Sequence, residues 1–311
     1  MTESEQGLNG EGLDVAGIAA LRDIPPPDAI GHRVVHGGAS RWEPSLIDDT
    51  VLADIEAAGV FAPRHQPAAL AGIRLTGETF PGVPQVACFD TAFHHDLPLV
   101  AQTLTVPGGH GVRRYGFHGL SYEWAVSSLG PQLGGRAVIA HLGSGSSLAA
   151  VLNGRAHDTT MGLTPIGGLM MSSRSGDVDP GALVHLMRSR GLDADGLERM
   201  VEDESGLLGV SGLTRDMREL LDARSTDPRA ALAVDLWVMT VRKHVAAMTA
   251  SLGGIDTLVF TGGIGERSQV LRDEICTGLA FLGDFTVHVI EADENRVVAR
   301  HTAAAVTYDT V

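Results

Sequence analysis

The most constraining feature of this 311-residue sequence is the stretch AVIAHLGSGSSLAAVLNGRAHDTT, residues 137–160. Two short apolar runs, 137–142 and 148–152, are separated by a Gly/Ser segment, and the second run ends at Asn153-Gly154. Asn-Gly is the dipeptide that best suits a two-residue hairpin turn, because both central residues of that turn need a positive φ. The stretch therefore predicts three consecutive strands, with a tight hairpin at Asn153-Gly154.

The Gly/Ser segment between the first two strands allows two interpretations. Gly143 and Gly145 permit a tight turn whose N–H groups face a ligand, and Ser144, Ser146 and Ser147 add hydroxyl donors, a chemistry that suits phosphate oxygens. The other interpretation is a hairpin loop that binds nothing. Neither the Walker-A spacing nor G-x-G-x-x-G before a helix is present, so any phosphate site here is of another kind.

Charge and cysteine content limit the class of protein. The net charge is −15, and basic pairs occur only at 113–114 and 242–243, which argues against nucleic acid or an anionic membrane as a partner. Two distant cysteines, Cys88 and Cys276, indicate reduced thiols rather than a disulfide framework. A signal pattern is absent, and no apolar run approaches the roughly 18 residues of a membrane helix. We therefore expect a cytoplasmic protein.

Two predicted strands in the first third carry charged side chains. Residues 30–38 form a predicted strand with Arg33, and residues 84–90 form a buried strand that ends at Asp90. An acid at the carboxyl end of a buried strand lies where open α/β sheets place their chemistry. The histidines at 94–95 do not indicate a metal site, because neighbouring side chains on an extended chain point apart.

Further candidates lie at loops and helix entrances. His118 precedes a predicted helix at 120–129, where it either binds an anion or fills a turn. Residues 161–180 contain Arg174 and have no periodicity, and such long irregular loops in compact domains are usually functional. The glycine-rich segment 262–266 suits either a nucleotide or a tight turn.

Apolar periodicity and capping residues predict the remaining elements. They are helices at 13–22, 45–58 (capped by Ser45), 180–190, 193–203, 214–221, 227–252 and 291–305, a helix after 266, and strands at 257–261 and 286–290. The strand at 286–290 is expected in the core. Glu294 is among the acids that begin the last helix, where an acid is an ordinary partner of the helix dipole.

Eight motifs in order then carry a family resemblance over most of residues 30–303. They are HRVVHGG (32–38), APRHQP (62–67), FDTAFH (89–94), RRYGFHGLSY (113–122), HLGSGSSLAAV (141–151), TTMGLTPIGGLMMSSRSGDVDPG (159–181), SGLLGVSGLTRDMREL (205–220) and VFTGGIGERSQVLR (259–272). Together they resemble the acetate kinase family, which belongs to the sugar kinase, Hsc70 and actin superfamily.

The resemblance implies an α/β protein with a two-lobed, ribonuclease H-like fold and a central cleft. Residues 1–93 with 296–311 would form the first lobe, and residues 94–295 a second lobe with the nucleotide-binding loops. The implied reaction transfers the γ-phosphoryl group of ATP to the carboxylate of acetate, with Mg²⁺, and gives acetyl phosphate and ADP. The implied partners are acetate, ATP and a second copy of the chain in a homodimer.

Roles carried over by matching motif fall into four groups. Catalytic roles are implied for Arg33, His65, Asp90, His118 and Arg174. Nucleotide-binding roles are implied for His141, Gly143, Ser144, Gly145, Ser146, Asp216, Met217, Arg218, Gly263, Ile264 and Gly265. Substrate binding is implied for Arg33 with an apolar pocket of Val35, Phe117 and Pro165. Glu294, with Asp90, would organise Mg²⁺.

Departures from the family pattern leave two functional classes open. Nothing in residues 1–29 resembles the family's first phosphate loop, of the type Asn-Gly-Ser-Ser-Ser-Leu-Lys, so we expect an incomplete first lobe and weak phosphoryl transfer. Arg64 replaces the leucine of the family's APLHNP motif beside the methyl pocket. The chain is thus either an active carboxylate kinase or an impaired, nucleotide-binding relative. A third hypothesis is an unrelated metal hydrolase built on the histidines.

Overall fold

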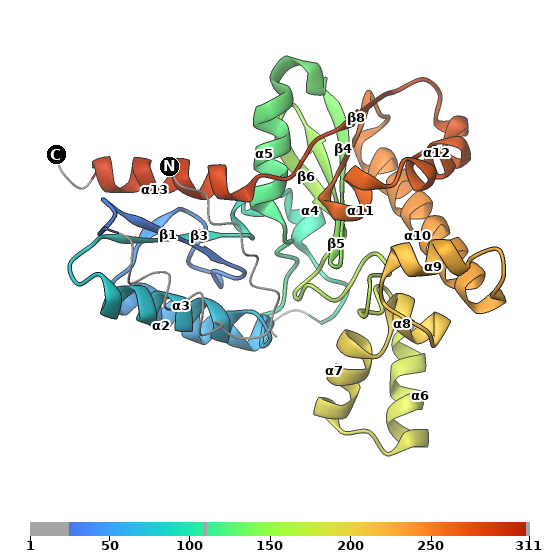
Figure 1. Cartoon of the computed structure of the whole chain (residues 1–311), viewed down its shortest axis with the longest axis horizontal. Helices are drawn as coiled ribbons and strands as arrows, with labels where there is room; N and C mark the ends of the chain where they lie inside the picture. Colours follow the sequence, from blue (N-terminus) through green and yellow to red (C-terminus); the bar gives the residue numbers. More distant parts are fainter. Residues whose placement is uncertain (1–24, 108–110, 309–311) are drawn as a thin grey trace. The chain divides into compact units, whose positions relative to one another are not determined.

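The computed structural model of the chain describes residues 25–107 and 111–308. Their internal contacts divide them into two compact units (Figure 1). Unit 1 comprises the described residues of Met1–His95 and Asp293–Val311, and unit 2 those of Asp96–Ala292. The sequence placed the boundaries after residue 93 and before residue 296. The helix predicted at 13–22 lies outside the described residues.

Unit 1 is a small sheet with helices on both faces. Its described strands are β1 (Ile30–Val34), β2 (Ser45–Leu46) and β3 (Gln85–Phe89), in the order β1-β3-β2. β1 runs parallel to β3, and β2 runs antiparallel to it. On one face lie α2 (Asp49–Ala57) and α3 (Gln66–Thr79), and on the other α13 (Glu294–Tyr308) (Figure 1). A short 3-10 turn, η1 (Ala58–Phe61), follows α2, and a second one, η2 (Ala92–His94), follows β3.

The side chains of β1 alternate between these two helical layers. A Cβ at Gly31 would lie 2.3 Å from Thr302 Oγ1 of α13, so only glycine allows this close packing. His32 points the other way, with Nε2 3.4 Å from Thr76 Oγ1 of α3. The strand period of two returns Arg33 to the α13 face, which places its guanidinium beside the start of that helix.

Unit 2 is built on a five-stranded mixed sheet in the order β6-β5-β4-β7-β8. Its strands are β4 (Arg136–Leu142), β5 (Ser146–Leu152), β6 (Arg155–Thr159), β7 (Thr257–Thr261) and β8 (Thr286–Val289). β4, β5 and β6 form an antiparallel meander, whereas β4, β7 and β8 are parallel. The hairpin prediction is confirmed, since Asn153 (φ 50°) and Gly154 (φ 79°) join β5 to β6.

Helices cover both faces of this sheet. α5 (Gly119–Leu129) lies on one face and α10 (Pro228–Leu252) on the other (Figure 1). The core lies between α10 and the sheet, where Trp237 packs with the side chains of alternate β4 residues. The other described helices are α4 (Leu99–Gln102), α6 (Pro180–Arg190), α7 (Ala194–Asp203), α8 (Gly206–Ser211), α9 (Met217–Ala223), α11 (Gly262–Arg267) and α12 (Gln269–Gly278), with 3-10 turns η3 (Gly130–Leu133) and η4 (Ala280–Leu282).

The helix predicted from Ser45 is wrong at its start. Ser45 lies in β2, paired with Ala87 of β3. The helix begins at Asp49, after Asp48, whose carboxylate accepts a hydrogen bond from Val51 N at 2.7 Å. Pairing with the sheet therefore overrides the local capping signal of Ser45.

Other boundaries also differ from the sequence-based predictions. The strand predicted at 30–38 ends at Val34. The strand at 286–290 was expected in the core, but β8 is an edge strand whose side chains are mostly exposed. The glycine-rich segment after β7 is the first turn of α11 rather than a turn before a helix. Helices α3 and α8 were not predicted.

Within residues 25–107 and 111–308, no helix has the length and the apolar character that crossing a membrane requires.

Candidate active site

In unit 1, one arginine lies between two carboxylates. Arg33 Nε lies 3.1 and 3.0 Å from the two carboxylate oxygens of Asp90, and Nη2 lies 2.7 Å from Oδ2. Arg33 Nη1 lies 2.5 Å from Glu294 Oε2. The Asp90 side chain is 2% exposed and that of Arg33 is 43% exposed, so the arginine covers the acid and keeps an open edge. Three residues predicted for the site from motifs far apart in the chain thus meet.

The backbone around this cluster explains how the three side chains converge. Asp90 directly follows β3, and its N–H donates to Val34 O at the end of β1 (2.9 Å). The carboxyl ends of two parallel strands therefore lie side by side, as open α/β sheets place their functional groups. Glu294 is the first residue of α13, which packs on these strands.

A buried glutamine that the sequence analysis missed links two motifs of unit 1. Gln66 Nε2 donates to His36 O (2.7 Å) and to Ile55 O (3.1 Å), and Gln66 Oε1 accepts from His36 N (3.4 Å). Gln66 is 1% exposed, so these bonds satisfy its amide. It ties the segment after β1 to the start of α3, beside the predicted residues His65 and Val35, which are partly buried.

In unit 2, two predicted histidines stack beside the Gly/Ser segment. The rings of His118 and His141 are 4.2 Å apart at 18°. His118 has a left-handed backbone (φ 57°) at the entrance of α5, and its Nδ1 is 2.8 Å from Ser147 Oγ. Ser121 Oγ of the same helix is 2.9 Å from His141 Nδ1. Both rings are thus oriented by hydroxyl groups.

Two of the three serine hydroxyls of the Gly/Ser segment form hydrogen bonds within the protein. Ser146 Oγ donates to Gly143 O (3.1 Å) and accepts from Gly143 N (3.2 Å), and Ser146 is buried. Ser147 Oγ lies 2.5 Å from Tyr122 Oη, besides its bond with His118. Burial raises the pKa of Tyr122 well above its usual value, which keeps the phenol neutral, although its bond with Ser147 acts in the opposite direction. Ser144 alone of the three serines is exposed.

The two glycines of this segment bring the predicted residues of unit 2 together. A Cβ at Gly145 would lie 3.3 Å from His118 Nε2 and 3.4 Å from Arg174 Nη1. A Cβ at Gly143 would lie 3.8 Å from His141 Nε2 and 3.9 Å from Gly263 N. Histidines, arginine and backbone N–H groups therefore line one short stretch of backbone, an arrangement suited to an anion.

Arg174 is held by several contacts of its loop. Its Nη1 donates to Pro165 O at 3.4 Å, and its Nε lies 3.8 Å from Glu202 Oε1. The neighbouring Ser172 N donates to Ser144 O (3.2 Å), which joins the loop to the Gly/Ser segment. These contacts set the guanidinium before any ligand arrives.

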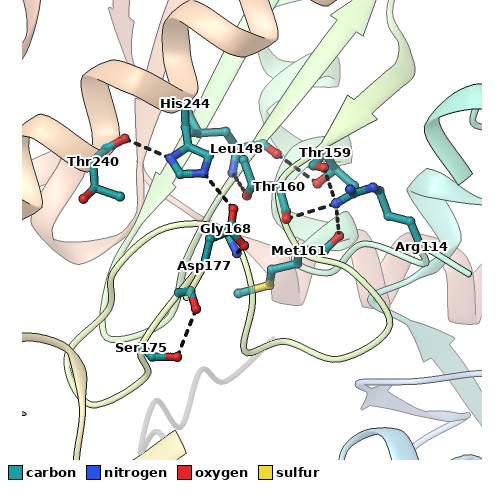
Figure 2. Close-up of polar contacts among 11 residues, drawn as sticks. Arg114, Leu148, Thr159, Thr160, Met161, Gly168, Ser175, Asp177, Thr240 and His244 are labelled. Atoms are coloured by element: carbon teal, nitrogen blue, oxygen red, sulfur yellow. Dashed lines mark hydrogen bonds and ion pairs between the residues drawn. The ribbon is translucent and has the colours of Figure 1, made fainter. Parts of the chain in front are cut away.

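Hydrogen bonds of Asp177 and Arg114 with backbone groups close the base of the Arg174 loop (Figure 2). Gly168 N donates to Asp177 Oδ1 (2.7 Å), and Asp177 N donates to Gly168 O (2.9 Å). Arg114 Nη1 donates to the carbonyl oxygens of Thr159, Thr160 and Met161 at 3.0, 3.1 and 3.2 Å. The loop is therefore irregular but held at both ends.

His244 of α10 adds a protonation-dependent contact to this base (Figure 2). Its Nδ1 is 2.9 Å from Thr240 O and its Nε2 3.4 Å from Asp177 Oδ2, so both ring nitrogens face acceptors. Only the imidazolium donates to both. Burial lowers the pKa of His244, and the positive charge of Lys243 acts in the same direction. The hydrogen bonds to Asp177 and Thr240 and the negative charge of Asp177 raise the pKa by more, so it lies above its ordinary value of 6.5.

This contact predicts a pH-dependent stability. The contribution of His244 is fully present below about pH 6.5 and is lost as the pH rises through its raised pKa. Asp177 is 70% exposed, so we expect less than about 1 kcal/mol. Asp177→Asn keeps the acceptor for Gly168 and removes the charge. The difference in the free energy of unfolding between native and Asp177→Asn protein should be larger at about pH 6 than at about pH 9; equal differences would contradict the expectation.

The residues predicted for the adenosine side differ in exposure. Met217 is 4% exposed and belongs to the core of unit 2. Asp216 caps α9 and binds Arg218 (Nη2 to Oδ2, 2.6 Å), and this bond, ahead of those from backbone N–H groups, lowers the pKa of Asp216 to about 2. In α11, Gly263 is exposed, and a Cβ there would meet no atom within 4 Å. The backbone of Gly263 is thus open to a ligand.

The three residues of the predicted methyl pocket belong to both units. Phe117 is 1% exposed, and Pro165 is also buried in unit 2. Val35 is partly buried in unit 1. Arg64, which replaces the leucine of the family motif, is exposed.

Comparison with known proteins identifies the family. Residues 18–310 match the model of the acetokinase family. An acetate kinase of Synechococcus sp. is 49% identical over 82% of this chain and 65% of its own length. An acetate kinase of Chloroherpeton thalassium is 43% identical over 93% of this chain and 70% of its own length. The chain thus spans about two thirds of the length of these curated relatives.

Solved structures agree with the sequence comparison. The crystal structure of Porphyromonas gingivalis acetate kinase has a TM-score of 0.84 at 39% identity, covering 90% of this chain and 78% of that one. A propionate kinase from Francisella tularensis has a TM-score of 0.85 at 37% identity, covering 89% and 79%. The predicted mixed α/β fold of the sugar kinase and actin type is confirmed. The chain belongs to the acetokinase family.

Proposed function

We propose that this chain transfers the γ-phosphoryl group of ATP to the carboxylate of acetate and releases ADP and acetyl phosphate. The observation that carries the proposal is the convergence of His118 and Arg174 on Gly145, in a member of the acetokinase family. A carboxylate oxygen attacks the γ-phosphorus while the bond from that phosphorus to the oxygen of ADP breaks. Atoms and electrons balance without a further reactant.

The proposed reaction requires the protein mainly to align acetate with the γ-phosphoryl group and to neutralise the charge of the transferring oxygens. Acetate is already an anionic nucleophile at neutral pH, so no general base is needed. In-line phosphoryl transfer is accelerated by positioning and by positive groups around the transferring oxygens. In this proposal Arg174 and His118 contact the moving phosphoryl group, and the planar fork of Arg33 holds the carboxylate of acetate.

The remaining predicted residues take binding roles in this proposal. His141 and residues 143–146 would contact the phosphates, and Gly263, Ile264 and Gly265 with 216–218 the adenosine. Val35, Phe117 and Pro165 would surround the methyl group of acetate, and His65 would line the same site. The open backbone of Gly263 and the proximity of its N–H to Gly143 support the nucleotide side.

The residues present fit a Mg²⁺ ion that arrives with ATP. Mg²⁺ is usually held by one or two carboxylates together with phosphate oxygens and waters. Asp90 and Glu294 supply two carboxylates within one cluster, and Arg33 neutralises only one of their charges. No group of three or more His, Cys, Asp or Glu side chains suited to a metal occurs among the described residues. Asp90 and Glu294 would hold the ion, which when bound offsets phosphate charge.

Two further parts of the proposal concern the setting of the protein. Cys88 and Cys276 are free thiols, which fits a reducing compartment, and we propose a cytoplasmic location. The homodimer implied by the family resemblance stays a prediction, and the molecular mass in solution would test it.

The experiment that tests the function is hydroxamate formation from acetate, ATP and hydroxylamine. ATP-dependent product that needs both acetate and Mg²⁺ is the expected result. Binding of ATP without any product would contradict the proposed activity and favour the impaired, nucleotide-binding relative. A negative control is the same assay with citrate in place of acetate, since a bulky tricarboxylate would not fit the small apolar pocket proposed above.

Acid length and Arg64 offer a separate test of the pocket. Acetate and propionate should be preferred over a six-carbon acid, because each added methylene meets the apolar wall rather than water. Arg64 is exposed, so Arg64→Leu should leave the ratio of kcat/KM values for acetate and butyrate within about twofold of native. A clear shift of that ratio would place the residue at the pocket.

A further inference from the structure

The chain leaves unit 2 through a short segment, residues 290–293, between β8 and α13. Ile290 N donates to Phe260 O at the end of β7 (2.9 Å). Trp124 Nε1 of α5 donates to Glu291 O (2.8 Å). The segment has no regular structure, yet its backbone is anchored to unit 2 at successive residues.

The third anchor of this segment is a carboxylate from α11. Ala292 N donates to Glu266 Oε1 at 2.9 Å, and Gly262 N donates to the same oxygen at 2.7 Å. Bonds from N–H groups to an ionised carboxylate are among the stronger hydrogen bonds of proteins. One oxygen atom therefore joins the first residue of α11 to the last residue of unit 2.

Only Asp293 separates this anchor from Glu294. Asp293 Oδ1 accepts from Arg296 N (3.1 Å), which caps the start of α13. Glu294, the next residue, contacts Arg33. One residue therefore lies between the anchored amide of Ala292 in unit 2 and the acid that contacts Arg33 in unit 1.

We propose that Glu266 is a positioning residue that couples the glycine-rich start of α11 to Glu294. The inference rests on the proposed function, in which residues 263–265 face the nucleotide and Glu294 faces Mg²⁺. Because both bonds end on one oxygen, Gly262 N and Ala292 N cannot move apart unless a bond breaks. In this proposal Glu266 acts through the backbone of Ala292 and not through a contact with nucleotide or acetate.

Three variants separate the acceptor from the charge. Glu266→Ala removes both bonds, whereas Glu266→Gln keeps an acceptor oxygen and removes the charge. Asp284→Ala is the matched control, because it removes one acidic charge from an exposed position of unit 2 whose side chain, among the described residues, makes no hydrogen bond or ion pair. Thermal unfolding checks that all three variants are folded.

Amide hydrogen exchange of residues 290–293 measures directly whether the hydrogen bond from Ala292 N to Glu266 is formed. In Glu266→Ala, the amide of Ala292 should exchange about 10- to 100-fold faster than in the native chain, the factor that corresponds to loss of a hydrogen bond to a charged group. Glu266→Gln and Asp284→Ala should stay close to native. Native exchange in Glu266→Ala would overturn the proposal.

The effect of nucleotide on hydrogen exchange, and the dependence of the rate on Mg²⁺, test the coupling between α11 and Glu294. Mg²⁺ with a non-hydrolysable ATP analogue should change exchange at 290–293 in the native chain and in Glu266→Gln, but not in Glu266→Ala. Absence of the change in the native chain, or an equal change in Glu266→Ala, would overturn the coupling. Glu266→Ala should also raise the Mg²⁺ concentration for half-maximal rate with little change in KM for acetate, and Glu266→Gln should restore it. The exchange results stand without turnover, so failure of the proposed activity is distinguishable from failure of this inference.

Discussion

Replacing Arg174 by alanine is expected to lower kcat for acetyl phosphate formation by about 10²–10³-fold. The guanidinium lies beside His118 at Gly145, where the proposed phosphoryl group would sit, and its loop holds it there before ligand binds. A preorganised positive group aimed at developing charge stabilises the transition state more than the ground state. The loss should therefore appear in kcat more than in KM for ATP when both are measured in the hydroxamate assay.

Two further variants make the Arg174 result specific. Arg174→Lys keeps the charge and loses the planar fork, so its kcat should lie between those of the native and alanine proteins. Arg188→Ala removes a cation from an exposed position on α6 and should leave kcat unchanged. A native kcat in Arg174→Ala, with the fold retained by circular dichroism, would remove Arg174 from the proposed mechanism.

Replacing Gly206 by alanine is expected to be among the most destabilising single changes in unit 2. Gly206 has φ +61°, and a Cβ there would lie 2.2 Å from Met171 O and 2.8 Å from Arg174 O. The left-handed backbone costs a non-glycine residue about 1–2 kcal/mol. The clash with two backbone oxygens adds about 1–3 kcal/mol, because backbone has to move. Chemical denaturation should show the sum as a lower free energy of unfolding.

The same helix supplies the matched control. Gly212 at the end of α8 also has φ +61°, but a Cβ there would meet no atom within 4 Å. Gly212→Ala should therefore lose only the conformational part, about 1–2 kcal/mol, and keep native kcat. Gly206→Ala should in addition lose activity, since the displaced carbonyl belongs to Arg174. Equal destabilisation by the two variants would show that the close contact carries no energy.

Local sequence determined much of the secondary structure. Asn153-Gly154 specifies a hairpin without any distant contact, because Asn and Gly tolerate the positive φ of the turn. The capping residues Asp193 and Asp227 mark the starts of α7 and α10, since each side chain accepts a backbone N–H within its own first turn. The ordered motifs also sufficed to identify the family and the mixed α/β fold.

Only the tertiary structure decided what depends on distant contacts. Ser45 pairs with β3 instead of capping a helix, and β8 lies at an exposed edge, because strand pairing and burial depend on the whole sheet. From sequence, Glu294 was an ordinary first-turn acid with a family resemblance. Its contact with Arg33 arises because α13 packs on β1 and β3, and no local pattern records that packing. No sequence pattern indicates the role of Glu266 for the same reason. Its partner is the backbone N–H of Ala292, which any residue except proline would supply.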